Sequence, residues 1–161
     1  MFILGIDPGT ARLGYGVIET KNGHKRGPVY VDAGCIITQM ETPMGERLLY
    51  LQQEIGKVLE KHKPDILAIE QLFFGANSKT AMAVGQARGV VMAEAARYKV
   101  PIAEYQGLTV KVAVTGYGRS DKKEVLKGVH RLLGMRRELK PDDVADGLAI
   151  ALCHFLKSQK N

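Results

Sequence analysis

Residues 2–10 of the sequence read Phe-Ile-Leu-Gly-Ile-Asp-Pro-Gly-Thr. No polar side chain occurs from residue 2 to residue 6, and the run ends at Asp7, followed by a Pro-Gly turn signal. A short, continuous apolar run that stops at a turn is typical of a strand buried on both faces of a sheet. Residues 2–7 are therefore predicted to form a central strand with Asp7 at its carboxyl end.

The rest of the chain alternates between strand and helix patterns. Further strands are predicted, from their apolar and β-branched runs, at residues 13–19, 29–38, 66–70 and 101–105. Helices are predicted, from apolar spacing and capping signals, at residues 48–59, 77–97, 107–114, 121–133 and 141–156. The short links between the first three strands favour an antiparallel meander. The order of elements predicts an α/β fold, in which a mixed sheet carries helices on its faces.

Length and composition are those of one compact domain. The chain has 161 residues, 45% of them hydrophobic and 25% charged, which predicts a single domain over residues 1–157 and a short frayed tail at 158–161. No apolar stretch approaches the ~18 residues of a membrane span, and residues 1–7 lack the basic leader of a signal peptide. Cys35 and Cys153 lack metal-ligand spacing, which favours buried, reduced thiols in a cytosolic protein.

The positive charge of the chain is confined to one segment. Residues 111–140 hold nine Lys and Arg against three acids, so this window accounts for the whole net charge of +6. A charged run can be simply a solvated face. Because the entire excess lies in one segment, the pattern favours a surface that binds phosphates.

Four carboxylates are predicted to meet at one edge of the sheet. Asp7 and Glu70 each end an apolar strand, and the crevice of an α/β sheet lies at the carboxyl ends of its strands. Asp143 and Asp146 are three residues apart on the last predicted helix and so share one helix face. This helix is otherwise apolar nearly all round and is predicted to be buried, where a carboxylate without a compensating cation is costly.

Each of these acids also has a structural interpretation. Asp7 could be a turn residue, and Glu70 could be a strand-end charge that faces solvent. Asp142 is predicted to be the helix N-cap, Asp143 could share that capping, and Asp146 could complement the helix dipole. The position of Asp146 on an apolar helix argues most strongly for a functional role.

Carboxylates gathered beside a basic surface suit Mg²⁺, which takes oxygen ligands and substrate phosphate oxygens. Two such ions can activate a water and stabilise the leaving oxygen in phosphodiester hydrolysis. The sequence has no phosphate-binding Gly-Lys loop, no serine-nucleophile motif and no zinc-ligand spacing. Its histidines, at residues 24, 62, 130 and 154, are scattered and are interpreted as structural or surface residues.

Four segments together resemble the motifs of RuvC-family Holliday-junction resolvases, in the same order and over essentially the whole chain. They are Gly-Ile-Asp-Pro-Gly-Thr at 5–10, Ala-Ile-Glu-Gln-Leu-Phe at 68–73, Val-Gly-Gln-Ala-Arg-Gly-Val at 84–90, and Asp-Val-Ala-Asp-Gly-Leu-Ala-Ile-Ala at 143–151. The first segment alone is shared with sugar kinases and actin-like ATPases, whereas the four in combination are specific. The resemblance implies an RNase H-like fold with a five-stranded mixed sheet and helices on both faces.

The resemblance also implies a set of site residues. The metal-binding acids would be Asp7, Glu70, Asp143 and Asp146, holding Mg²⁺, with two ions in each site and Mn²⁺ able to substitute. Phe73 matches an aromatic residue that stacks on a base at the opened crossover. Lys111 and Lys122 match lysines near the scissile phosphate, and the charged segment adds Arg119 and Lys123 as candidate DNA-binding residues. Phe73 and Phe74 could instead form a hydrophobic plug under the next helix.

The resemblance further implies partners. The family acts on four-way junction DNA as a homodimer, prefers T-rich cleavage sequences and works with the RuvA–RuvB branch-migration complex in the bacterial cytoplasm. The Ala- and Gly-rich helix predicted at 77–97 is a candidate dimer interface, because small residues permit close approach of a second copy.

Three alternative functions differ from junction resolution in the sequence or the substrate that they require. An actin-like kinase needs two lobes and a second phosphate loop, which 161 residues cannot supply. A related RNase H-like nuclease acting on RNA would cleave duplex RNA in preference to a junction. A junction-binding protein without catalysis would not require the four acids.

The basic segment generates a testable prediction. If Lys111, Arg119, Lys122 and Lys123 contact phosphates, junction affinity should fall steeply with salt, because binding releases condensed counterions. Replacing each residue by Gln should reduce the slope of log affinity against log salt by about 0.9 per lost contact. Titrations of labelled junction at several salt concentrations measure this slope. An unchanged slope would indicate that the basic segment is only a solvated face.

Overall fold

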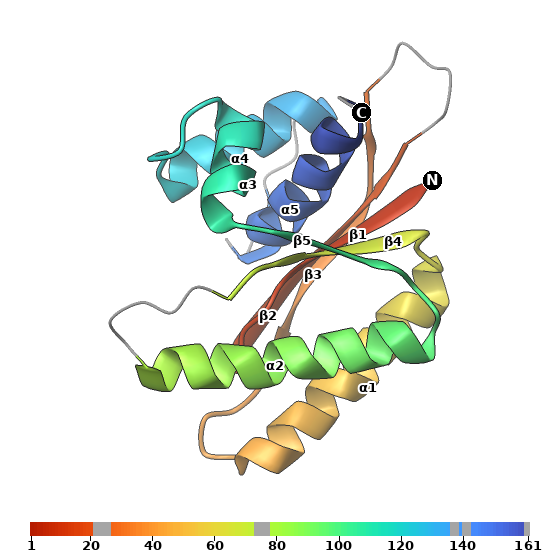
Figure 1. Ribbon diagram of the computed structural model, residues 1–161, viewed down its shortest axis with the longest axis vertical. Coiled ribbons are helices and arrows are strands. Elements are labelled where there is room, and N and C mark those ends of the chain that lie inside the picture. Colours follow the sequence, from red (N-terminus) through yellow and green to blue (C-terminus); the bar gives the residue numbers. More distant parts are fainter. Residues whose placement is uncertain (21–26, 73–77, 136–138, 140–142, 160–161) are drawn as a thin grey trace.

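The centre of the fold is a five-stranded sheet with strand order β3-β2-β1-β4-β5, seen in the computed structural model (Figure 1). The strands are β1 (Phe2–Asp7), β2 (Arg12–Glu19), β3 (Val29–Ile37), β4 (Ile66–Glu70) and β5 (Ile102–Tyr105). The structure describes residues 1–20, 27–72, 78–135, 139 and 143–159. β1 is the middle strand: it pairs antiparallel with β2 and parallel with β4, while β2 pairs antiparallel with β3 and β4 parallel with β5. The predicted meander and mixed sheet are confirmed.

Helices cover both faces of the sheet (Figure 1). They are α1 (Met44–His62), α2 (Ser78–Arg97), α3 (Gly107–Thr115), α4 (Lys122–Leu133) and α5 (Asp143–Ser158). Residues of α3, α4 and α5 form one hydrophobic core with one face of the sheet. Residues of α1 and α2 form a second core with the other face. The sheet is therefore the middle layer of three.

Local sequence signals predicted most element boundaries to within one or two residues. At α4, Asp121 is the N-cap: its Oδ1 accepts from Glu124 N at 2.8 Å, and Glu124 Oε2 accepts from Asp121 N at 2.8 Å, which together form a capping box. The last helix continues to Ser158, past the expected end near Leu156. Asp142, the expected N-cap of that helix, and residues 160–161 of the expected tail lie outside the described residues. No helix among the described residues is long and apolar enough to cross a membrane.

The buried helix α5 lies directly on a row of small residues that crosses the whole sheet. Cross-strand pairing aligns Ala33, Gly16, Gly5, Ala68 and Ala103, one from each strand. A Cβ at Gly16 would come within 2.5 Å of Leu148 N, and a Cβ at Gly147 would come within 2.6 Å of the Tyr15 backbone. A Cβ at Gly5 would overlap with the Gly147 carbonyl. The backbones of helix and sheet are therefore in contact, with no side chain between them.

Side-chain alternation along the strands then selects the face on which each residue lies. In β1, Ile3 belongs to the core under α5, whereas Leu4 and Ile6 belong to the core under α1 and α2. Asp7 shares the parity of Ile3 and Gly5 and so lies on the α5 face. The same alternation in β4 places Glu70 on the face of Ala68, which also belongs to the α5 core.

The close contact predicts that Gly16 cannot carry a side chain. Gly16→Ala should destabilise the protein by about 1–3 kcal/mol, because the added methyl group meets helix backbone and forces α5 to shift. Urea denaturation measures the change. Gly45→Ala is the matched control: a Cβ at Gly45, in the first turn of α1, has nothing within 4 Å. Its effect should be neutral or stabilising by up to about 1 kcal/mol. Equal losses in the two variants would contradict the proposed contact.

Candidate active site

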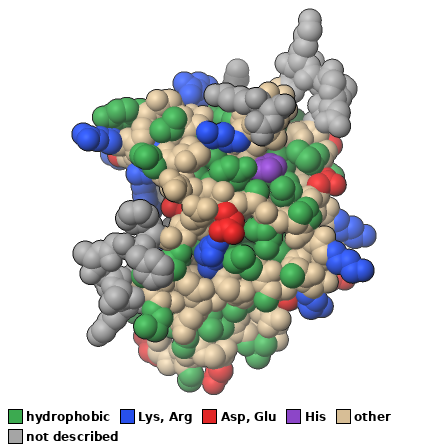
Figure 2. All heavy atoms as spheres, viewed as in Figure 1, with side chains coloured by type: hydrophobic (Ala, Val, Ile, Leu, Met, Phe, Trp, Pro, Cys, Tyr) green, Lys and Arg blue, Asp and Glu red, His purple; other side chains and the backbone are tan. Residues whose placement is uncertain are grey.

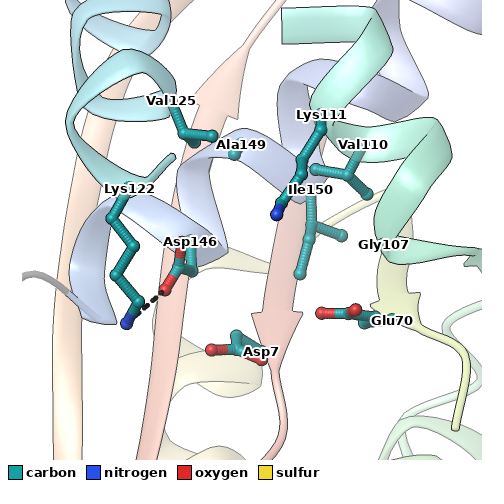
Figure 3. A pocket seen from close by; sticks show the side chains of 10 residues that line it. All are labelled: Asp7, Glu70, Gly107, Val110, Lys111, Lys122, Val125, Asp146, Ala149 and Ile150. Atoms are coloured by element: carbon teal, nitrogen blue, oxygen red, sulfur yellow. Dashed lines mark ion pairs between the residues drawn. The ribbon is translucent and has the colours of Figure 1, made fainter. Parts of the chain in front are cut away.

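A cavity of about 180 Å³ opens where β1 and β4 end, between the sheet and helices α3, α4 and α5 (Figure 3). Its lining combines three carboxylates, two lysines and a small apolar wall. The lining residues are Asp7, Glu70, Gly107, Val110, Lys111, Lys122, Val125, Asp146, Ala149 and Ile150. Five of the predicted site residues are therefore brought together from five different elements.

The three carboxylates reach the cavity for separate local reasons. Asp7 and Glu70 end adjacent parallel strands on the α5 face of the sheet. Asp146 is on α5, one residue before Gly147, where the helix touches β2. Figure 3 shows the side chains of Asp7, Glu70 and Asp146 around a common space. Asp143 is the first residue of α5, but its side chain lies outside the described part of the structure.

The environment of Glu70 disfavours its negative charge. Burial raises the pKa of Glu70, the nearby charge of Asp146 raises it further, and Lys111 opposes both effects. The carboxylate also lies against the start of α3, since a Cβ at Gly107 would overlap with Glu70 Oε1. The carboxylates of Glu70 and Asp146 are thus close enough to repel each other.

Two lysines supply positive charge to the same cavity. Lys122 Nζ lies 3.7 Å from Asp146 Oδ2, and its side chain is 72% exposed. Such an exposed ion pair is weak and can be exchanged for another partner at little cost. Lys111 extends from α3 toward the space between Asp7 and Glu70 (Figure 3). The cavity therefore offers cationic groups beside its carboxylates.

The donor set fits a hard divalent cation. Its oxygen donors are carboxylates, as Mg²⁺ prefers, and a cation between them would offset the repulsion that raises the pKa of Glu70. Among the described residues, no three His, Cys, Asp or Glu side chains stand close enough together to form a ready metal site.

Other predicted site residues lie elsewhere. Arg119 and Lys123 are exposed, near the start of α4, and do not line the cavity. Phe73 and Phe74 fall outside the described residues, so their predicted roles stay predictions. Sequence reasoning missed Gly107, which borders Glu70: no local signal marks it, because only the pairing of β4 with β5 brings the start of α3 to that carboxylate.

Two of the histidines, His62 and His154, contact polar side chains of neighbouring elements. His62 Nε2 lies 2.8 Å from Asp32 Oδ2, and His154 Nδ1 lies 2.8 Å from the Tyr105 hydroxyl. Cys35 and Cys153 are not joined in a disulfide bond, and burial raises the pKa of the Cys153 thiol to about 11. Cys153 is buried and Cys35 is partly buried. These groups lie outside the lining of the cavity.

Comparison with known proteins gives one consistent result. Residues 3–154 match the family model described as crossover junction endodeoxyribonuclease RuvC. The chain is 53% identical over 154 residues to the protein of that name from Desulfitobacterium hafniense, covering 96% of this chain and 92% of the relative. It is 48% identical over 158 residues to that from Caldicellulosiruptor saccharolyticus, covering 98% and 94%.

The structural comparison agrees with the sequence comparison. Thermus thermophilus RuvC, solved in complex with a Holliday junction substrate, superposes with a TM-score of 0.91 at 32% identity and covers 99% of this chain and 96% of its own. The expected RNase H-like fold is thereby confirmed. The chain belongs to the RuvC family of crossover junction endodeoxyribonucleases.

Proposed function

We propose that this protein resolves Holliday junctions by metal-dependent hydrolysis of DNA phosphodiester bonds at the cavity between β1, β4 and α5. One observation carries the proposal: Asp7, Glu70 and Asp146 converge from three elements and are joined in one cavity by Lys111 and Lys122. Family membership and the junction-bound structure of the Thermus thermophilus relative support the choice of substrate.

The residues divide the chemistry between them. Asp7, Glu70 and Asp146 provide the oxygen ligands, and Asp143, one helical turn before Asp146, is proposed as the fourth. Two Mg²⁺ ions in each site, replaceable by Mn²⁺, would supply an activated water and stabilise the charge on the leaving oxygen. Lys111 and Lys122 neutralise the scissile phosphate. Lys122 can do so because its exposed contact with Asp146 is readily exchanged.

The apolar wall of the cavity has a supporting role. Val110, Val125 and Ile150 come from three helices and surround the charged groups on one side. Because such a wall lowers the local dielectric, each interaction between a charged side chain and the phosphate is stronger than in water. The acids themselves sit on strands and a buried helix, which hold a catalytic geometry more firmly than loops do.

DNA beyond the scissile phosphate would be held by other groups. Arg119 and Lys123 are proposed to contact flanking phosphates, since both are exposed beside the cavity-lining Lys122. Phe73, three residues after Glu70, is proposed to stack on a base at the crossover, an interaction worth about 1–3 kcal/mol. Junction resolution also requires two cuts, and a chain with one active site can make both within one binding event only as a dimer.

We propose that the working unit is a homodimer in the bacterial cytoplasm, acting with the RuvA–RuvB complex. A four-way junction has near two-fold symmetry, and two-fold dimers are the commonest closed assemblies. The candidate interface is the outward face of α2. There Met82 is 67% exposed, and a Cβ at Gly89 would have nothing within 4 Å, so a second helix could approach closely.

The proposal predicts that binding and cutting can be separated. Asp7→Asn and Glu70→Gln should lower the cleavage rate of a synthetic mobile junction by more than about 100-fold, the upper effect expected from a supporting residue. Junction affinity should persist or increase, since negative charge near phosphates is removed. Single-turnover cleavage with and without Mg²⁺, and fluorescence anisotropy without metal, provide the two measurements.

Glu60→Gln is the matched control for these variants, because Glu60 is an exposed carboxylate on α1, on the opposite face of the sheet. Its cleavage and binding should equal wild type. Loss of affinity together with activity in Asp7→Asn or Glu70→Gln would indicate a structural carboxylate. Preferred cleavage of duplex RNA by wild type would indicate a nuclease acting on RNA, and tight junction binding without cleavage in Mg²⁺ or Mn²⁺ would indicate a non-catalytic binding protein.

The dimer predicts paired cuts within one binding event. On a supercoiled cruciform plasmid, two cuts give linear product and one cut gives a nicked circle. Wild type should give mainly linear product, whereas mixed dimers with one Asp7→Asn subunit should give mainly nicked circles, because each subunit holds one site. Gel electrophoresis distinguishes the products. Linear product from mixed dimers, or sedimentation as a monomer that still cuts both strands, would disprove the paired arrangement.

A further inference from the structure

An arginine outside the catalytic cavity contacts the strand end that carries Glu70 from the α2 side of the sheet. Arg88, on α2, donates from Nε to the backbone carbonyl of Glu70 at 3.2 Å. Its Nη2 forms an ion pair with Glu104 Oε2 on β5, and its side chain is 18% exposed. In Figure 2, one acidic and one basic side chain touch near the middle of the face where β5 and α2 lie in Figure 1. One guanidinium thus joins α2, β4 and β5.

The hydrogen bond from Arg88 reaches β4 at a point where the strand is paired on one side only. The pairing of β1 with β4 ends at Ile6 and Ile69, whereas β5 still pairs with Glu70 through Tyr105. Beyond this point, Gln71 N donates to Tyr105 O at 2.8 Å. A backbone carbonyl in a partly buried site needs a hydrogen-bond partner, and Arg88 supplies one.

Glu104 fixes the direction of that donor. In β5 it pairs with Ile69 of β4, whose side chain belongs to the core under α1 and α2. Glu104 therefore emerges on the α2 side of the sheet, where it meets Arg88. A planar guanidinium can serve a carboxylate and a carbonyl together in a fixed geometry, which the single ammonium of a lysine cannot reproduce.

A role for Arg88 in binding DNA phosphate is less consistent with these contacts. Its charge is already paired with Glu104, whereas phosphate recognition by arginine uses an available guanidinium fork. Arg88 is also absent from the described lining of the cavity. Among the described residues, the contact that links Arg88 to the site is its hydrogen bond to the backbone carbonyl of Glu70.

We propose that Arg88 is a positioning residue for Glu70, with Glu104 orienting its guanidinium. By holding the carbonyl of residue 70, Arg88 restricts rotation of the backbone that carries the carboxylate and keeps that carboxylate directed into the cavity. This inference rests on the proposed function in one respect, that Glu70 is a metal ligand.

The decisive variant is Arg88→Lys, which preserves charge but not the fork. Exchange of the Gln71 amide in the metal-free protein, measured by hydrogen–deuterium exchange, should become about fivefold faster, as expected for loss of one hydrogen bond at the strand end. Amides of β1 and α5 should exchange as in wild type. The Mg²⁺ concentration for half-maximal junction cleavage should rise by about tenfold or more, the usual effect of losing a group that orients a ligand. Junction affinity without metal should change less than about twofold, because the net charge is kept.

Glu104 provides a second route to the same answer if Arg88→Lys folds poorly. Glu104→Ala should reproduce both effects, whereas Glu104→Gln retains an acceptor for the guanidinium and should remain close to wild type. Arg97→Lys is the matched control: Arg97 is also on α2 and also pairs with a glutamate, Glu94, but its side chain is 61% exposed and it is at the far end of the helix. It should change neither Gln71 exchange nor the Mg²⁺ requirement.

The outcomes separate this inference from the proposed function. Weaker junction binding by Arg88→Lys with an unchanged Mg²⁺ requirement would make Arg88 a phosphate contact and overturn the proposal. Unchanged exchange at Gln71 would also overturn it. If wild type itself fails to cleave junctions in Mg²⁺, the proposed function fails, whereas faster Gln71 exchange in Arg88→Lys would still support the positioning of the Glu70 backbone.

Discussion

The contact between the backbone of α5 and the backbones of β1 and β2 is the constraint on which the rest of the structure depends. Gly5, Gly16 and Gly147 leave no room for a side chain between helix and sheet. The row of small residues across all five strands extends this flat surface beneath the helix. Because interiors are packed at crystal-like density, a helix seated at this distance cannot shift without displacing its neighbours.

That constraint explains why the acids converge. Gly5 lies two residues before Asp7 on the same face of β1, and Gly147 directly follows Asp146. The residues that permit close approach are thus next to the residues that form the site. Fixing the distance between helix and sheet also fixes the distance between carboxylates from separate elements, so the geometry of the site is set by the packing of the core.

The two faces of the sheet have different tasks. Helices α3, α4 and α5 contribute the lysines, Asp146 and the apolar wall of the cavity. On the other face, α1 and α2 hold the ends of the strands that carry Asp7 and Glu70. Buried Arg47 donates to Thr38 Oγ1 at 2.8 Å, and Thr38 Oγ1 donates to Thr10 O in the turn after Asp7. Arg88 has the corresponding role behind Glu70.

The sequence by itself determined the elements and the middle strand, and it predicted that Asp7, Glu70 and Asp146 would meet, because apolar periodicity, capping residues and strand ends are local signals. The capping box at Asp121 and the strand end at Asp7 are examples. Only the tertiary structure decided that Gly107 borders Glu70 and that Arg88 reaches its carbonyl, since both contacts arise from parallel pairing between strands more than 30 residues apart and from packing across the sheet. Register and helix-to-sheet distance are long-range quantities. No local pattern encodes them.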